Sequence, residues 1–248
     1  MLVKYNYDLD KIWEKVDWEH GDIYVIDMKS DESRVYISGV CFKGEHFDRD
    51  WEEQKACLRI YDKNGNYIMG FKEDSEDSSA AKRIELDSQG NLVVLIYYEN
   101  GLAILEKFSH SGDSLWSKTI ASNSLNVAMS SDLDDSIYIA YTVTDGEEAG
   151  SLVTIKYDQN GNAQWVRTKE GSYENPLLPS FIQISDDGEV FVIGTFFDLS
   201  EYHHDAMILK YDANGNEQWE IVHDVIENCY YKDKDEDDEE DSCGCGCS

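Results

Sequence analysis

Apolar and polar residues alternate along short stretches of this chain, and each stretch ends at a cluster of Asp, Asn, Ser and Gly. Such alternation is typical of β-strands, and turn-forming residues between two alternating runs predict a hairpin. Two stretches are almost the same: KYDQNGNAQW at 156–165 and KYDANGNEQW at 210–219. In the first, Asp158 and Gly161 hold the first and fourth turn positions, which suits a type I turn closed by a left-handed glycine. The pattern therefore predicts a β-hairpin with a three-residue loop and a bulge.

The expected register gives each hairpin one apolar and one polar face. Tyr157 is expected opposite Ala163, and Ile155 opposite Trp165, because paired residues of antiparallel strands share a face. On this interpretation Ile, Tyr and Trp form the core side of the hairpin. The same reasoning predicts that three tryptophans are packed inside blades: Trp116, Trp165 and Trp219.

An aromatic residue followed eight positions later by Trp recurs along the chain. The pairs are Tyr5 with Trp13, Phe108 with Trp116, Tyr157 with Trp165 and Tyr211 with Trp219, whereas Tyr61 meets Met69. Hairpins of a second type lie between them, such as RIELDSQGNLVVLIYY and FIQISDDGEVFVIGTF. The repeat spacing of about 47 to 56 residues accommodates four short strands. A repeat of that length with four strands is typical of a propeller blade.

The hairpins number nine, which is odd, whereas whole four-stranded blades need an even number. The predicted fold is therefore all-β: a small β-propeller of four to five four-stranded antiparallel blades, one of them incomplete. Three arrangements satisfy this count: a five-bladed ring with one two-stranded blade, a closed four-bladed ring with a spare hairpin, or a ring completed by a second chain. The first hairpin is the atypical one, because Leu9 stands where the others have Gly.

The stretches LVTIKYDQNGNAQW and MILKYDANGNEQW resemble the bacterial β-propeller repeats of the SBBP type, whose signature is K-Y-D-x-x-G-N-x-x-W. The resemblance covers most of residues 2 to 222. It implies a ring of four-stranded blades, commonly on secreted or surface proteins, and no shared active site. This chain departs from that group because no secretory leader is visible and because the repeats are fewer.

The formal net charge of the chain is −31. Nucleic acids and anionic membranes are bound through basic patches, so neither is an expected partner of such an acidic surface. A protein partner is expected, and a basic one would suit the charge. Residues 1–231 are predicted to form one propeller domain, since this length and the 41% apolar content are sufficient for a single core.

The N-terminal residues MLVKYNYDLD enter a strand pattern directly, so no signal peptide is visible and a cytoplasmic location is expected. In that reducing environment Cys41, Cys57 and Cys229 are interpreted as ordinary thiols. A disulfide between Cys41 and Cys57 stays open as an alternative at this stage.

Residues 232–248, KDKDEDDEEDSCGCGCS, are predicted to be a disordered acidic tail, because seven consecutive acids repel one another and bury no apolar surface. Thiolates are preferred ligands of soft ions such as Cu(I) and Zn(II), which makes Cys243, Cys245 and Cys247 candidate metal ligands. Cross-linking of chains, conversion to a modified peptide or lipid anchor, and no specific role are the alternatives. No other cofactor is expected.

No short catalytic motif occurs, neither a nucleophile elbow nor a zinc-protease, phosphate-loop or dinucleotide pattern. No catalytic or cofactor-binding residue is therefore predicted. His203, His204 and Asp205 are interpreted as a polar loop before the last hairpin. The predicted function is a non-enzymatic binding or scaffold module with a flexible Cys-ended tether. The alternatives are an enzyme with a site on the propeller rim or in its channel, and a carrier whose tail is metal-binding or modified.

Overall fold

The computed structural model describes residues 1–16, 21–42, 54–121, 123–147, 149–198 and 203–223. These residues form β-strands joined by turns and loops, without a helix. The predicted all-β fold is therefore confirmed. No helix in the described ranges could cross a membrane.

Within these ranges, eighteen strands form four four-stranded antiparallel sheets and one two-stranded sheet, so the prediction of nine hairpins with one incomplete blade is confirmed. The N-terminal hairpin consists of β1 (Leu2–Tyr5) and β2 (Lys11–Lys15). Blade I consists of β3 (Ile23–Ser30), β4 (Arg34–Cys41), β5 (Lys55–Asp62) and β6 (Tyr67–Lys72). Blade II consists of β7 (Ser79–Leu86), β8 (Leu92–Tyr98), β9 (Ala103–Phe108) and β10 (Ser114–Ala121). Blade III consists of β11 (Ser124–Ser131), β12 (Ile137–Val143), β13 (Leu152–Tyr157) and β14 (Ala163–Lys169), and blade IV of β15 (Leu177–Ile184), β16 (Val190–Asp198), β17 (His203–Tyr211) and β18 (Glu217–His223).

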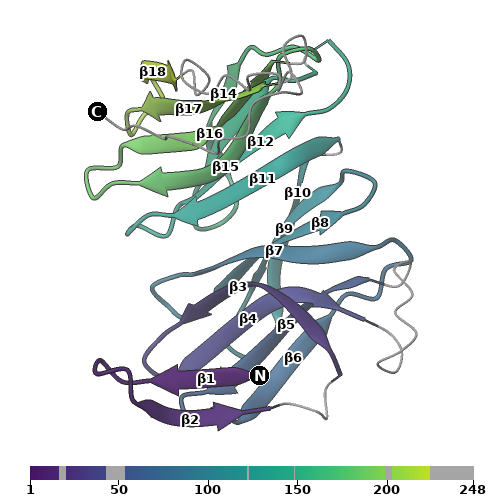
Figure 1. Cartoon of the computed structure of the whole chain (residues 1–248), viewed down its shortest axis with the longest axis vertical. Coiled ribbons are helices and arrows are strands. Elements are labelled where there is room, and N and C mark those ends of the chain that lie inside the picture. Colours follow the sequence, from purple (N-terminus) through teal and green to yellow (C-terminus); the bar gives the residue numbers. More distant parts are fainter. Residues whose placement is uncertain (17–20, 43–53, 122, 148, 199–202, 224–248) are drawn as a thin grey trace, which may run out of the picture.

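The blades follow one another in sequence order, with the N-terminal hairpin at one end and blade IV at the other (Figure 1). Contacts between blades run through the inner strands: β7 packs on β3, β11 on β7, and β15 on β11. The strands of blade I and blade IV share no extensive contact in the described ranges. The described part of the propeller is thus an open arc of blades.

The turn chemistry predicted from Asp158 and Gly161 is confirmed. The Asp158 carboxylate accepts hydrogen bonds from the backbone N–H of Asn160 and Asn162, at 2.9 and 2.8 Å, and from the Asn162 side-chain amide at 3.0 Å. Gly161 has φ +76°. The bonds from Asn162 and Asn160 lower the pKa of Asp158 below its ordinary value. The second Asn of the repeat therefore donates hydrogen bonds to the Asp of the turn. In the N-terminal hairpin, Leu9 stands at the position of this glycine and also has a positive φ, 64°.

The predicted register is confirmed for one pair and wrong for the other. Tyr157 pairs with Ala163, but Trp165 pairs with Lys156 and not with Ile155. A bulge between Ala163 and Trp165 adds one residue, Gln164, to the outer strand, and a shift of one residue turns every later side chain to the opposite face. Tyr157 therefore faces blade II, whereas Trp165 faces blade IV.

Trp165 thus packs across the boundary between blades III and IV, and not inside one blade as predicted. The indole Nε1 of Trp165 donates to the carbonyl of Ala213 in blade IV at 3.3 Å, and its ring lies 6.1 Å from that of Tyr211. A Cβ on Gly215 would meet the Trp165 ring at 2.7 Å, so only glycine leaves room for the indole. The same contact recurs with Trp13 over Gly65 and Trp116 over Gly161, and Met69 replaces the indole at Gly112.

The prediction that Trp219 is packed inside a blade is wrong. Trp219 holds the same repeat position as Trp165, but no later blade follows it among the described residues. Its side chain is 39% exposed. The Trp219 indole therefore lacks, among the described residues, the turn of a following blade on which Trp165 packs.

The lysine of the repeat joins the two hairpins of its own blade. Lys107 Nζ lies 2.7 Å from a carboxylate oxygen of Asp87, and both side chains are almost fully buried. The corresponding pairs are Lys156 with Asp132 and Lys210 with Glu189. A buried pair of this kind is costly to break on one side only, because the remaining charge stays without its partner.

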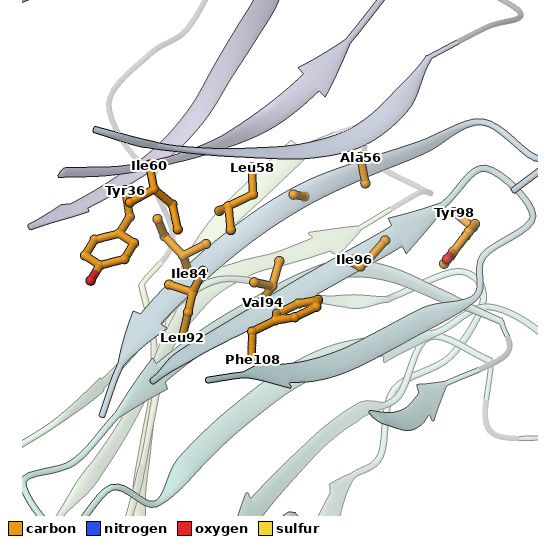
Figure 2. Packing of buried hydrophobic residues seen from close by; sticks show 11 residues of the cluster. Tyr36, Ala56, Leu58, Ile60, Ile84, Leu92, Val94, Ile96, Tyr98 and Phe108 are labelled. Atoms are coloured by element: carbon orange, nitrogen blue, oxygen red, sulfur yellow. The ribbon is translucent and has the colours of Figure 1, made fainter. Parts of the chain in front are cut away.

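Apolar side chains fill the spaces between blades. One cluster joins blades I and II, a second joins II and III, and a third joins III and IV. Figure 2 shows the first, in which Leu58 and Ile60 of blade I meet Ile84, Leu92 and Val94 of blade II. The hydrophobic core is therefore a series of interfaces between sheets, and each blade needs a neighbour to bury its faces.

We predict that Gly215→Ala destabilises the protein more than Gly146→Ala. Both glycines have positive φ, +78° and +76°, so an added Cβ costs each about 1–2 kcal/mol. Gly146 has no atom within 4 Å of the added Cβ, whereas Gly215 lies beneath Trp165. The overlap should add about 1–3 kcal/mol to the loss in free energy of unfolding, measured by urea denaturation. Equal losses in the free energy of unfolding would show that overlap with the Trp165 indole adds nothing to the cost of the substitution.

Candidate binding site

The N-terminal hairpin is an outer hairpin of the repeat that lacks an inner partner. Its Trp13 donates to the carbonyl of Lys63 at 3.2 Å, as Trp165 does to the next blade. In blades I to IV, two inner strands precede the outer hairpin in the same sheet. Among the described strands, β1 pairs only with β2. The place of the missing inner strands, in front of β3 and β4, is therefore not occupied by any described strand.

A cavity of about 670 Å³ lies at this place and is here called the N-terminal cavity. Its residues come from the N-terminal hairpin on one side and from blade I on the other. Figure 1 shows β1 and β2 beside blade I at the lower end of the arc. The apolar lining residues are Met1, Leu2, Val16, Ile23, Val25 and Ile37.

The polar side of the N-terminal cavity is formed by Lys15, Asp22, Arg59 and two tyrosines. Arg59 lies on β5, is only 4% exposed, and donates from Nη2 to the carbonyl of Gly21 at 2.8 Å. Tyr61 and Tyr67 meet edge to face with their ring centroids 5.8 Å apart. These groups place two cations, one carboxylate and two phenols beside an otherwise apolar wall. The sequence shows Arg59 only as a single charge within the run CLRIY.

The interpretation of Cys41 and Cys57 as free thiols is wrong, because the two form a disulfide. Cys41 ends β4 and Cys57 lies on β5, with Gly39 paired to Cys57 and Cys41 paired to Lys55. Both sulfurs are buried, and Arg59 Nη2 lies 3.8 Å from the Cys41 Sγ. The pairing of β4 with β5 brings together two cysteines 16 residues apart in sequence. The disulfide stiffens the sheet behind the N-terminal cavity.

The edge of β1 is a second feature of this site. Because β1 pairs with β2 alone among the described strands, the backbone N–H and C=O groups of its other edge are not used in a sheet. Such an edge can accept an added strand. The site therefore offers backbone hydrogen bonds on one side and apolar contacts on another.

The residues singled out from sequence do not converge on one site. His203 and His204 begin β17 and do not form a loop as predicted. The His204 ring stacks on Phe197 with centroids 4.4 Å apart, and Asp205 is buried. No group of three or more potential metal ligands exists in the part of the chain that the structure describes. Cys229, Cys243, Cys245 and Cys247 lie outside the described residues.

One carboxylate with a raised pKa lies on the inner strands. Glu85 of β7 contacts Lys29 of β3 at 2.9 Å and accepts a hydrogen bond from Ser131 of β11 at 3.3 Å. Burial raises the pKa of Glu85, and the contacts with Lys29 and Ser131 only partly oppose this. The carboxylate thus joins three successive blades.

No protein-family model matches the chain, and no curated protein matches it in sequence. Solved structures do match it. The β-propeller domain of the trilobed protease from Pyrococcus furiosus, described as having an open velcro topology, gives a TM-score of 0.52 at 13% identity, over 82% of this chain and 58% of that chain. A quinonprotein alcohol dehydrogenase-like protein from Bacteroides thetaiotaomicron gives 0.50 at 13% identity, over 89% and 50%. The chain thus spans 58% and 50% of these two structures. The likeness shows the fold alone: a β-propeller with four-stranded antiparallel blades.

We predict that reduction of the disulfide lowers stability. A cross-link that closes a loop of this length contributes about 3 kcal/mol to the free energy of unfolding, and the sequence separation is 16 residues. Urea denaturation with and without dithiothreitol measures this contribution. The Cys41→Ala/Cys57→Ala double variant should not respond to the reductant, which controls for the tail cysteines. A wild-type midpoint that does not depend on the reductant would contradict the disulfide.

Proposed function

We propose that this protein is a non-enzymatic binding or scaffold module that takes an extended segment of a protein partner in the N-terminal cavity. The observation that carries the proposal is the incomplete first sheet. No described strand occupies the place of the two inner strands that every complete blade has, and this space is bordered by the edge of β1 that pairs with no described strand. A segment of another protein fits such a gap in shape and in hydrogen bonding.

Addition of a strand to an exposed sheet edge is a common way to bind an extended peptide. The backbone of the partner would bond to β1. Because side chains alternate along a strand, every second one would point toward Val25 and Ile37 of blade I. Val25 is 49% exposed, so its contact surface is available.

The charge of the protein supports a partner with basic residues on either side of an apolar segment. The net charge of −31 attracts positive flanking residues over long distance and raises the association rate. The wall of the cavity is mostly apolar, with Lys15, Asp22 and Arg59 on its polar side, so the inserted part is better apolar than charged. Nucleic acids and anionic membranes are repelled by the same field.

An enzyme is the second candidate function, and Glu85 is the observation that favours it. A buried carboxylate with a raised pKa is a feature of acid–base sites. Its bonds to Lys29 and Ser131 give it a role in joining the blades, which supports the binding module instead. The proposal also includes blades of the SBBP type and a C-terminal tether with metal-binding or cross-linking through Cys243, Cys245 and Cys247.

We predict that peptides selected from a displayed random library against the full chain bind at the N-terminal cavity. Val25→Glu places a charge on the apolar wall and should weaken binding of a selected, labelled peptide at least tenfold, or about 1.4 kcal/mol. Fluorescence anisotropy measures the dissociation constant.

Val166→Glu is the matched control, because Val166 is also 49% exposed but lies on β14 of blade III. Binding by this variant should equal that of the wild type. The proposal fails if both variants bind the peptide equally well, or if the library yields no peptide that binds.

A further inference from the structure

The outer face of blade IV carries a continuous row of apolar side chains. Ile193 of β16 pairs with Phe181 of β15 and with Ile208 of β17, which pairs in turn with Ile221 of β18. Phe181 and Ile221 are 62% and 51% exposed. The row therefore crosses all four strands of the sheet and is open along much of its length. We call it the outer face of blade IV.

The same repeat position is covered in every earlier blade. The residues that correspond to Ile193 are Ser38 in blade I, Leu95 in blade II and Ala140 in blade III, and each is 0% exposed. Ile193 itself is 39% exposed. No described strand thus covers, at the end of the arc, the sheet face that the repeat buries in the earlier blades, and large exposed apolar faces mark interaction sites.

In the earlier blades, the chain that follows the outermost strand supplies the cover. After β6 of blade I comes β7, which packs on β3, β4 and β5. After β14 of blade III comes β15, which packs on β11, β12 and β13. The connections are short: β10 ends at Ala121 and β11 begins at Ser124. The residues just beyond β18 therefore stand in the sequence position of the segment that covers a blade.

These residues have the composition that such a cover needs. Residues 224–231 read DVIENCYY, and the acidic run begins a few residues later. Val, Ile, Cys and Tyr are suited to a strand on an apolar surface, whereas the acids beyond them are not. The segment 225–231 has seven residues, of which only Glu227 and Asn228 are polar, and β7 and β15 have eight residues each.

We propose that residues 225–231 of the same chain cover the outer face of blade IV, on Phe181, Ile193 and Ile208. A covalently attached segment reaches its site at an effective concentration of about millimolar. A second copy would bring together two bodies of charge −31, which repel each other. The proposal is independent of the partner proposed for the N-terminal cavity, and it agrees with the predicted domain boundary at Tyr231.

Cys229 permits a direct test in the full chain. With Cys243, Cys245 and Cys247 replaced by Ser, Phe181→Cys or Ile193→Cys places a second thiol on the outer face of blade IV. Under mild oxidation, one of these variants should form a disulfide with Cys229 within the same chain, at least ten times faster than Val166→Cys. Mass spectrometry of the digested monomer identifies the linked peptide.

Each outcome decides the proposal. Equal rates for the Val166→Cys control, or no link at either position, would overturn it. A link between two chains, seen as a dimer without reductant, would assign the face to a second copy and would also overturn it. As a second measurement, Ile226→Asp should slow the link at least fivefold, because it places a charge in the covering segment, whereas Ser242→Asp in the acidic tail should not change it.

Discussion

The contact of one indole ring with the turn glycine of the next blade is the constraint on which the arrangement of blades depends. Trp165 lies over Gly215 and donates to Ala213, so the turn of blade IV is held against the outer strand of blade III. The glycine satisfies two needs at once, because it takes positive φ and leaves space for the ring. This explains why the chain contains almost the same ten residues twice. Within a repeat, Lys forms an ion pair with the other hairpin of its own blade, and Asp and Asn form the hydrogen bonds of the turn. Tyr and Gly contact the preceding blade, and Trp contacts the following blade.

Because each blade packs on the next one, the first and last members of the described repeat each lack a neighbour on one side. At the first end, the N-terminal hairpin locks onto blade I through Trp13 but brings no inner strands, and the N-terminal cavity results. At the last end, Trp219 and Ile193 face outward because no further blade is described. The two surfaces for which binding is proposed therefore lie at the two ends of the described repeats. Function is proposed at the first end, and cover by the chain's own segment at the other.

The sequence predicted the hairpins and the blades well because turn chemistry is local. Asp158, Gly161 and Asn162 lie within five residues and determine the turn without help from the rest of the chain. The face of Trp165 was predicted wrongly, since the bulge that reverses it depends on how the two strands pair. The disulfide between Cys41 and Cys57 was left open because it forms only when β4 lies beside β5. The odd number of hairpins predicted an incomplete blade, but the N-terminal cavity could not be predicted, because its lining depends on how the N-terminal hairpin packs beside blade I. The cytoplasmic location and the roles of the tail cysteines stay predictions.

Two variants at the same repeat position test the central claim most directly. Urea titrations of the full chain give the free energies of unfolding of Trp165→Ala and Trp219→Ala. Trp165 contacts the following blade, whereas Trp219 has no following blade among the described residues. The account predicts a loss of about 3–5 kcal/mol for Trp165→Ala, as for a large aromatic truncation in a core. It predicts a loss of about 1 kcal/mol or less for Trp219→Ala, because its ring contacts only its own sheet. Equal losses would contradict the claim that the tryptophans act across blade boundaries.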